Sequence, residues 1–156
     1  MAQEIERKFI VFNNSYKHFI QSKQYILQGY LSSVPERTVR IRISGEAGFI
    51  TIKGIGDKTG LSRFEWEHPI TLRDAQALLK ICEPGIIEKF RYKVIEGTHA
   101  FIIDEFLDDN EGLVIAELEL KDENESFERP SWLGEEVTGD TKYYNSMLRI
   151  RPYSTW

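Results

Sequence analysis

Charged residues occupy every second position along several segments of this chain, and this alternation is the feature that most constrains its fold. The first example is Glu4-Ile5-Glu6-Arg7-Lys8, close to the N-terminus. Alternate residues of a β-strand share a face and lie roughly 7 Å apart, so Glu4, Glu6 and Lys8 would stand in one row. Two carboxylates in such a row can bracket a divalent cation, while the lysine meets an anion on that cation. The pattern predicts a strand with one strongly charged face.

The same period of two recurs through most of the sequence. Short breaks that carry Gly, Asp and Asn separate several of the alternating segments and are typical of hairpin turns. We expect eight strands, at residues 2–10, 24–31, 37–44, 47–54, 62–70, 86–96, 99–107 and 113–121. Because hairpins join antiparallel neighbours, the sheet should be largely antiparallel.

Three segments break the alternation and favour helices. Residues 13–21 begin with Asn and Ser side chains that can cap a short helix. Thr71 and Asp74 resemble a capping box ahead of an apolar stripe. A third helix is expected over residues 140–148, with an Asp as its cap. The polar residues 122–129 are expected to form a loop or a frayed helix.

The expected strands carry charges at one parity and apolar or aromatic residues at the other. The clearest examples are residues 39–43, 63–67, 89–92 and 117–120. Each strand would therefore have an apolar face and a charged face. The apolar faces need a covering layer, and the amphipathic helices are the available partners.

Two arrangements of the charged faces are compatible with this pattern. An open antiparallel sheet can expose its polar face to water. Alternatively, the eight strands close into a barrel with the charged face inside. Solvated faces usually mix Thr, Ser, Gln and Lys, whereas Glu, Arg and Lys dominate here, and Glu-x-Glu occurs at residues 4–6, 65–67 and 117–119. Like charges two residues apart repel unless a cation or a basic strand compensates, so we favour the barrel.

A closed barrel would gather many charged side chains in its interior. They are Glu4, Glu6, Lys8, Arg40, Arg42, Lys53, Arg63, Glu65, Glu67, Lys89, Arg91, Glu117 and Glu119. Such an interior cannot be dry, because burying unpaired charge is very costly. We expect a wet tunnel for a polyphosphate with Mg²⁺ or Mn²⁺, since guanidinium groups bind phosphate oxygens and hard metals bind carboxylates and phosphates.

Composition favours one domain over residues 1–156, which is enough chain for a substantial core. The net charge of −5 gives no overall basic field of the kind that binds duplex nucleic acid. Cys82 is the only cysteine, which excludes an internal disulfide and suits a reducing compartment. No signal peptide or membrane-spanning run is evident. We therefore expect a cytoplasmic protein without a membrane or duplex nucleic acid as partner.

The order of these motifs resembles the CYTH superfamily, also called the triphosphate tunnel metalloenzymes, over nearly the whole chain. The hallmark Glu-x-Glu-x-Lys stands at residues 4–8. It is followed in order by Arg40 and Arg42, by residues 51–54, by Arg63, Glu65 and Glu67, by Lys89 and Arg91, by residues 103–106, and by Glu117 and Glu119. The resemblance implies an eight-stranded antiparallel tunnel with helices outside and the last helix near one mouth. It also implies hydrolysis or cyclisation of triphosphates with a divalent metal.

Roles for individual residues follow from the same resemblance. The implied metal ligands are Glu4, Glu6, Glu117 and Glu119, with Asp104 as a further candidate. The implied phosphate-binding residues are Lys8, Arg40, Arg42, Lys53, Arg63, Lys89 and Arg91. Of Glu65 and Glu67, one would hold a second metal or orient water while the other pairs with Arg63. We place Glu65 among the catalytic residues.

Tyr30 is a further catalytic candidate. It lies in the second expected strand, on the parity of Gln28. If the first two strands pair as neighbours, Tyr30 can reach Lys8, and a Lys8–Tyr30 dyad would position the attacking water. The alternative is a packed core aromatic with a satisfied hydroxyl.

The expected activity is hydrolysis of inorganic tripolyphosphate to pyrophosphate and phosphate, because the chain has no obvious insertion for recognising a base. The alternatives, in order, are a nucleoside or thiamine triphosphatase, an adenylate cyclase of the class IV type, and a polyphosphate-binding module without catalysis. The three Glu-x-Glu pairs argue against the last, since carboxylates beside an anion gain little unless metal is present. Apolar outer faces left uncovered by helices would leave room for a homodimer.

Overall fold

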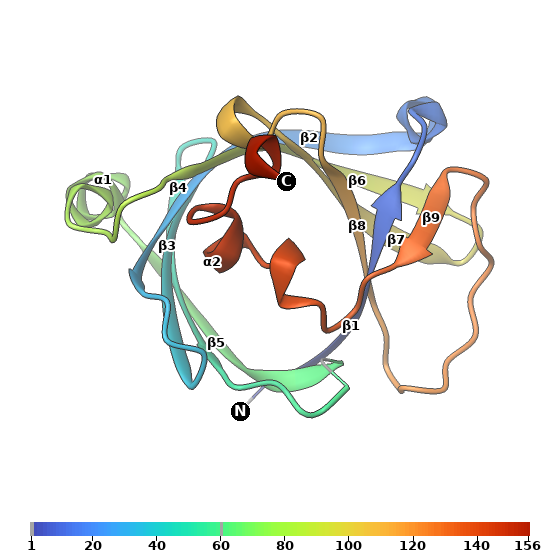
Figure 1. Cartoon of the computed structure of the whole chain (residues 1–156), viewed down its shortest axis with the longest axis horizontal. Coiled ribbons are helices and arrows are strands. Elements are labelled where there is room, and N and C mark those ends of the chain that lie inside the picture. The colour runs from blue at the N-terminus through green and yellow to red at the C-terminus, as the bar shows by residue number, and fades with distance from the viewer. Residues whose placement is uncertain (1, 60) are drawn as a thin grey trace.

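The computed structural model has a closed antiparallel barrel as its main feature (Figure 1). It describes residues 2–59 and 61–156, and the side chains of residues 5–59 and 61–156. Eight strands form the ring: β1 (Ala2–Val11), β2 (Ile20–Ser32), β3 (Arg37–Ser44), β4 (Ala47–Gly54), β5 (Ser62–Ile70), β6 (Ile87–Glu96), β7 (His99–Phe106) and β8 (Val114–Glu119). Neighbours follow the order β5, β4, β3, β2, β6, β7, β8 and β1, and the pairing of β1 with β5 closes the ring. The predicted eight-stranded barrel is confirmed.

Strand β1 closes the ring because it changes neighbours along its length. Residues 2–5 pair with β5, and residues 6–10 pair with β8. A short ninth strand, β9 (Leu133–Glu136), joins β1 at Phe9 and Val11. The sequence did not predict β9, because four residues are too few to show a period of two.

Strand β2 is the element whose boundary differs most from the prediction. It begins at Ile20 and not at residue 24, because the expected helix over residues 13–21 is only a 3₁₀ helix, η1 (Ser15–Phe19). Residues 21–25 of β2 are all exposed, so no alternation marks them as strand. The other seven strands begin and end within two residues of their expected positions.

Helix α1 (Leu72–Lys80) packs outside the barrel, against β3 and β4 (Figure 1). The Thr71 hydroxyl accepts a hydrogen bond of 3.0 Å from the Asp74 backbone N–H, which is the expected N-terminal cap. The helix approaches β4 so closely that a Cβ at Gly48 would lie 2.7 Å from the Ala75 Cβ. The contact therefore requires a glycine at position 48.

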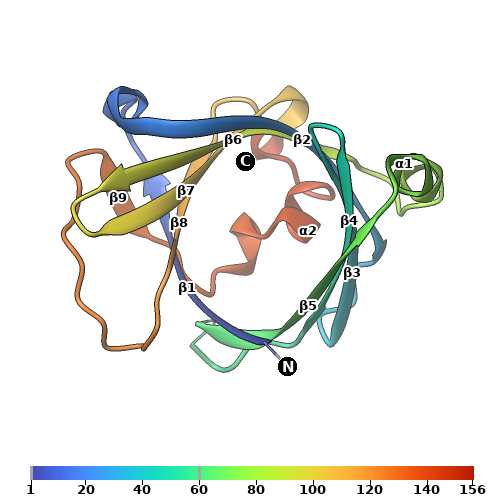
Figure 2. The same ribbon diagram turned by 180° about the vertical axis from the view of Figure 1, so that it is seen from behind.

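The C-terminal segment lies across the ring of strands in both views (Figures 1 and 2). The helix expected over residues 140–148 is divided there into a 3₁₀ helix, η3 (Thr141–Tyr143), and a single turn, α2 (Asn145–Leu148). The Asp140 carboxylate caps η3 by accepting a hydrogen bond from the Lys142 N–H at 3.1 Å. The expected cap is present, although the helix is shorter than predicted.

Two more 3₁₀ helices, η2 (Asp108–Asn110) and η4 (Tyr153–Thr155), complete the described secondary structure. Residues 122–129 form neither helix nor strand, so the expected loop is present and the alternative of a frayed helix is not. Within the described residues, no helix combines the length and the apolar character that crossing a membrane requires.

Two apolar clusters stabilise the barrel from different sides. The larger lies on the outer faces of β1, β6, β7 and β8 and includes the fully buried Phe101 and Trp132. The smaller contains Ile115, which shares the parity of Glu117 and so faces the barrel interior. It packs there against Leu148 of the C-terminal segment and its neighbours. Apolar side chains thus fill one side of the interior at this end, and a charged cavity occupies the rest.

Candidate active site

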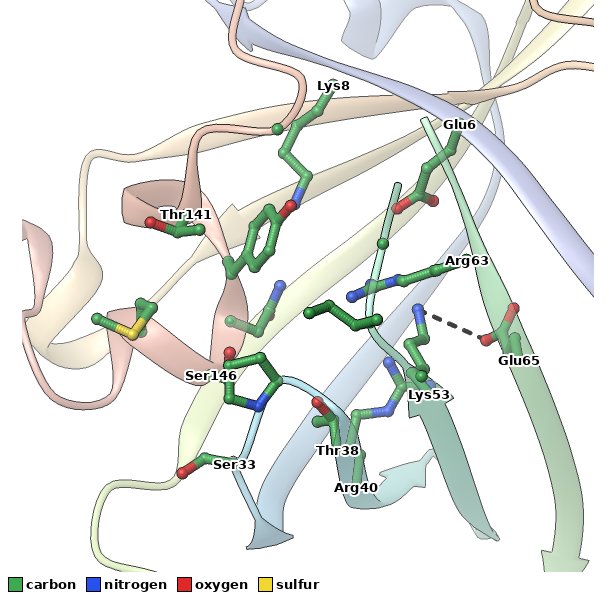
Figure 3. Close-up of a pocket in the computed structure, with 18 of the residues that line it drawn as sticks. Glu6, Lys8, Ser33, Thr38, Arg40, Lys53, Arg63, Glu65, Thr141 and Ser146 are labelled. Atoms are coloured by element: carbon green, nitrogen blue, oxygen red, sulfur yellow. Dashed lines mark ion pairs between the residues drawn. The ribbon is translucent and has the colours of Figure 1, made fainter. Parts of the chain in front are cut away.

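A cavity of about 770 Å³ lies inside the barrel and carries most of the predicted site residues (Figure 3). Its basic lining residues are Lys8, Arg40, Arg42, Lys53, Lys58, Arg63 and Arg91. Its acidic lining residues are Glu6, Asp57, Glu65, Glu67 and Glu117. The lining therefore has more cations than carboxylates, although the chain as a whole carries a net charge of −5. This local excess of positive charge favours an anionic ligand.

Arg40 lies on β3 and is held by side chains of β4 and β5. It donates a 3.0 Å hydrogen bond to the Thr51 hydroxyl and lies 3.4 Å from the Glu67 carboxylate. Thr51 in turn donates to Glu67 at 2.8 Å. The buried Nε of Arg40 has no acceptor among the described residues, so this guanidinium keeps a donor for another oxygen.

Arg42 is held by a single neutral side chain. Its Nε and one terminal nitrogen both donate to the Gln28 Oε1, at 3.0 and 2.9 Å. Burial, followed by the nearby cations Arg40 and Arg91, lowers the pKa of Arg42 well below its ordinary value. A guanidinium stays protonated in proteins, so the lowered pKa means that the positive charge of Arg42 is poorly stabilised by its surroundings. A bound anion would stabilise this charge.

Asp104 holds a buried ion-pair cluster together. Its two oxygens accept hydrogen bonds from the Arg91 Nε at 2.7 Å, from a terminal nitrogen of Arg91 at 2.8 Å and from the Lys89 Nζ at 2.7 Å. Burial alone would raise the pKa of Asp104, but Arg91 and Lys89 outweigh it and hold that pKa well below its usual range. Asp104 and Lys89 are almost fully buried and lie behind the cavity, whereas Arg91 lines it. The contacts of Asp104 are those of a residue that positions Arg91.

Glu6 and Glu117 are the predicted metal ligands that line the cavity. Burial alone would raise the pKa of Glu117, but Lys8, with its Nζ 3.9 Å away, and Arg91 hold that pKa at about 2. Glu119 pairs with Glu6 across β1 and β8, is exposed, and lies outside the cavity lining. The backbone of Glu4 lies opposite Arg63 on β5, and its side chain lies outside the described side chains.

The carboxylates of the cavity lining are candidate ligands of a hard divalent cation. Among the described residues, no group of three or more His, Cys, Asp or Glu side chains gathers as a metal site. Mg²⁺ commonly binds through one or two carboxylates and completes its coordination with water and substrate phosphates. Glu6 and Glu117, both in the cavity beside Lys and Arg side chains, fit that requirement.

The two glutamates of β5 have different partners. The Lys53 Nζ lies 3.6 Å from the Glu65 carboxylate (Figure 3), and Glu67 is held by Arg40 and Thr51. The Arg63 guanidinium lies 5.7 Å from the ring centroid of Tyr144, which is a cation–π distance. From the sequence, Arg63 is the expected partner of one of the two glutamates, whereas Lys53 and Arg40 are partners that the sequence did not predict.

The strand order removes the condition on which the Lys8–Tyr30 dyad depended. β1 pairs with β5, β8 and β9, whereas β2 lies between β3 and β6, so the first two strands are not neighbours and this condition is not met. The Lys8 Nζ lies near Glu117 and 4.9 Å from the Tyr144 ring centroid. Tyr30 is buried, lines the cavity, and accepts a 3.4 Å hydrogen bond from the Gln28 amide.

Irregular segments contribute a part of the site that the sequence did not predict. Residues 55–58, between β4 and β5, and residues of the C-terminal segment such as Tyr144 and Asn145 also line the cavity. These segments show no period of two, and neither Tyr144 nor Asn145 carries a charge. The alternation of charged residues, which identified the rest of the site, therefore does not identify Tyr144 or Asn145.

Fold and site together define a closed antiparallel barrel around a cavity lined by more cations than carboxylates. The model of the CYTH domain family matches residues 2–151, so this chain belongs to the CYTH domain family. The family resemblance seen in the sequence is thereby confirmed.

Similar proteins cover the whole chain. It is 45% identical to an inorganic triphosphatase of Acetivibrio thermocellus over 157 residues, which span 100% of this chain and 99% of that protein. It is 35% identical to an inorganic triphosphatase of Nitrosomonas europaea over 154 residues, covering 94% and 97% of the two chains. The crystal structure of an inorganic triphosphatase matches 94% of this chain and 97% of its own, with a TM-score of 0.67 and 31% identity.

Proposed function

We propose that this protein hydrolyses inorganic tripolyphosphate to pyrophosphate and orthophosphate inside the barrel, with Mg²⁺ or Mn²⁺ as cofactor. The observation that carries the proposal is the cavity, in which an excess of Arg and Lys side chains lies beside the carboxylates of Glu6 and Glu117. The two relatives named inorganic triphosphatase support it. We further propose that residues 1–156 act as one domain and that the protein works in the cytoplasm.

The basic residues would bind the phosphate chain. Guanidinium groups match phosphate oxygens with paired donors, so Arg40, Arg42 and Arg91 would hold the central part of the anion. The other proposed contacts come from Lys8, Lys53 and Arg63. Lys89 would act from behind the lining, through the Asp104 carboxylate that it shares with Arg91.

In the proposed reaction, a water oxygen attacks the terminal phosphorus. A phosphorus–oxygen bond forms to the water, the bridging phosphorus–oxygen bond breaks, and pyrophosphate leaves with the bonding electron pair. Glu65 lines the cavity and is our candidate to accept the water proton, while Lys53 and the arginines stabilise the charge on the phosphate oxygens. Tyr30 stays a candidate because it lines the same space, without the proposed contact to Lys8.

The metal would be held by Glu6 and Glu117, with Glu4 and Glu119 as further proposed ligands. A bound divalent cation would neutralise phosphate charge and polarise the phosphorus–oxygen bonds. Asp104 is better placed as the partner of Arg91 and Lys89, because all its described contacts are to these two cations. We therefore propose a positioning role for Asp104 instead of metal coordination.

Release of orthophosphate tests the proposal and its alternatives. The purified protein would be incubated with tripolyphosphate, ATP or thiamine triphosphate, each with Mg²⁺ or Mn²⁺. We expect the highest kcat/KM with tripolyphosphate and no turnover in EDTA. Faster hydrolysis of ATP or thiamine triphosphate would favour those substrates, cyclic AMP formed from ATP would indicate a cyclase, and no turnover of any substrate would leave only a binding role.

A further inference from the structure

We propose that Asn145 is a substrate-contacting residue, whose side-chain amide donates a hydrogen bond to a phosphate oxygen and is oriented for this by Lys89 and Gln28. The inference rests on the proposed function, because it concerns the same anion in the same cavity. Asn145 is the first residue of α2, in the segment that crosses the barrel mouth, and it lines the cavity.

The oxygen of the Asn145 amide is already engaged inside the barrel. It accepts hydrogen bonds from the Lys89 Nζ at 2.9 Å and from the Gln28 Nε2 at 3.3 Å. Lys89 is fully buried behind the lining and Gln28 is fully buried on β2. The amide oxygen therefore points away from the cavity, toward groups that a ligand in the cavity does not reach.

The hydrogen-bond network admits only this orientation of the Asn145 amide. A lysine ammonium can only donate, so the atom facing Lys89 must be an acceptor. The orientation of Gln28 is fixed in the same way, because its Oε1 accepts from two nitrogens of Arg42, which is always a donor. The Gln28 Nε2 must then face outward as a donor to Asn145, so two cations determine the orientation of the Asn145 amide from two sides.

The nitrogen of the Asn145 amide is left with two donor hydrogens. Among the described residues, none accepts a hydrogen bond from the Asn145 Nδ2 in the structure. Because Asn145 lines the cavity while its oxygen is engaged behind the lining, these donors are available to an oxygen in the cavity. An anionic oxygen is the strongest acceptor that such a neutral donor can meet there.

The position of Asn145 is fixed by a second anchor at the other end of α2. Arg149 donates hydrogen bonds of 2.6 Å to the Glu83 carboxylate, 2.8 Å to the Ser33 hydroxyl and 2.7 Å to the Pro84 carbonyl. These partners belong to the loops that follow β2 and α1. With α2 anchored at both ends, the Asn145 donor is held in place before substrate arrives, which lowers the entropic cost of binding.

Two substitutions at position 145 separate a donor role from a structural one. Asn145→Asp keeps an acceptor for Lys89 and Gln28 but removes the donors and faces the substrate with a carboxylate. Asn145→Ala removes both functions without adding charge. Asn124→Asp, in the exposed loop over residues 122–129, is the control for one added negative charge.

The readouts are the Kd for tripolyphosphate, measured by calorimetry in EDTA, the KM with metal, and the Tm. We expect Asn145→Asp to keep the wild-type Tm while its Kd and KM rise by about tenfold or more, through loss of a charge-assisted bond and repulsion of the anion. Asn145→Ala should bind more tightly than Asn145→Asp, and Asn124→Asp should match the wild type.

The proposal is overturned if Asn145→Asp has the Kd and KM of the wild type, or if the Asp and Ala variants weaken binding equally. If Asn145→Asp does not fold, the test is Asn145→Ala, and a Kd equal to that of the wild type would then overturn the proposal. Failure of the proposed function looks different, because wild-type protein would then bind tripolyphosphate without releasing orthophosphate. The measurement in EDTA tests Asn145 even in that case.

Discussion

Replacing Asp104 by Asn should destabilise the folded protein strongly, because the structure makes this carboxylate the only described acid in contact with the buried Lys89. Lys89 has no exposed surface, and its Nζ lies 2.7 Å from Asp104. Removing one partner of a buried ion pair costs roughly 3–5 kcal/mol, since the other charge stays buried without compensation. Because the Asn side chain keeps one acceptor oxygen for Lys89, we expect a loss of stability at the lower end of this range, about 3 kcal/mol.

Urea denaturation measures this loss through the free energy of unfolding extrapolated to water. For a domain of this size, about 3 kcal/mol corresponds to a fall in Tm of roughly 6–12 °C. Asp109→Asn, on the exposed face of η2, is the matched control and should change the stability by less than about 0.5 kcal/mol. A loss for Asp104→Asn as small as the control's would refute the reasoning.

The effect of Asp104→Asn should also depend on pH. Burial alone would raise the pKa of Asp104, but Arg91 and Lys89 lower it below the ordinary value of 3.8. A carboxylate with a lowered folded-state pKa stabilises the protein fully above its unfolded pKa and loses this contribution as the pH falls through the folded pKa. The difference between wild type and variant should therefore be complete at neutral pH and shrink below about pH 4. A difference that grew on acidification would contradict the assignment.

Three further predictions concern the metal, the C-terminal anchor and the helix cap. Glu117→Gln should lower kcat with Mg²⁺ by about 100-fold while tripolyphosphate still binds in EDTA, and an unchanged metal titration of orthophosphate release would contradict this role. Arg149→Ala should lower the free energy of unfolding in urea by roughly 2 kcal/mol, because it removes three hydrogen bonds of a nearly buried guanidinium, and no loss would show that this anchor contributes little. Thr71→Ala should cost about 1 kcal/mol in the same assay by removing the cap of α1, and no loss would show that the hydrogen bond to Asp74 contributes little.

The barrel could be predicted from the sequence because charge and burial follow the same period of two in most strands. The exposed start of β2 and the short β9 were not predicted, since neither has one face buried along several residues. For the site, the parity of Arg40 or Glu117 indicates the face on which the side chain lies, and both line the cavity. Parity does not identify the partner, however, and Asp104 meets Arg91 only because β6 and β7 pair in one particular register.

Distances divide the charged pairs of the interior into two groups with different consequences. The Asp104 contacts to Lys89 and Arg91 are 2.7–2.8 Å long and lie behind the cavity lining, so they are suited to hold the scaffold. Three pairs that line the cavity are longer: 3.4 Å for Arg40 with Glu67, 3.6 Å for Lys53 with Glu65, and 3.9 Å for Lys8 with Glu117.

Longer ion pairs in a water-filled cavity are worth less than short buried ones, so their members can change partners at a lower cost. A triphosphate with its divalent metal offers both members of such a pair a better partner, because phosphate oxygens meet the cation while the metal meets the carboxylate. A polyanion without metal would satisfy only the cations and leave Glu117 facing negative charge. The alternation of acids and bases along the strands is thus better suited to a metal-bound triphosphate than to an anion alone.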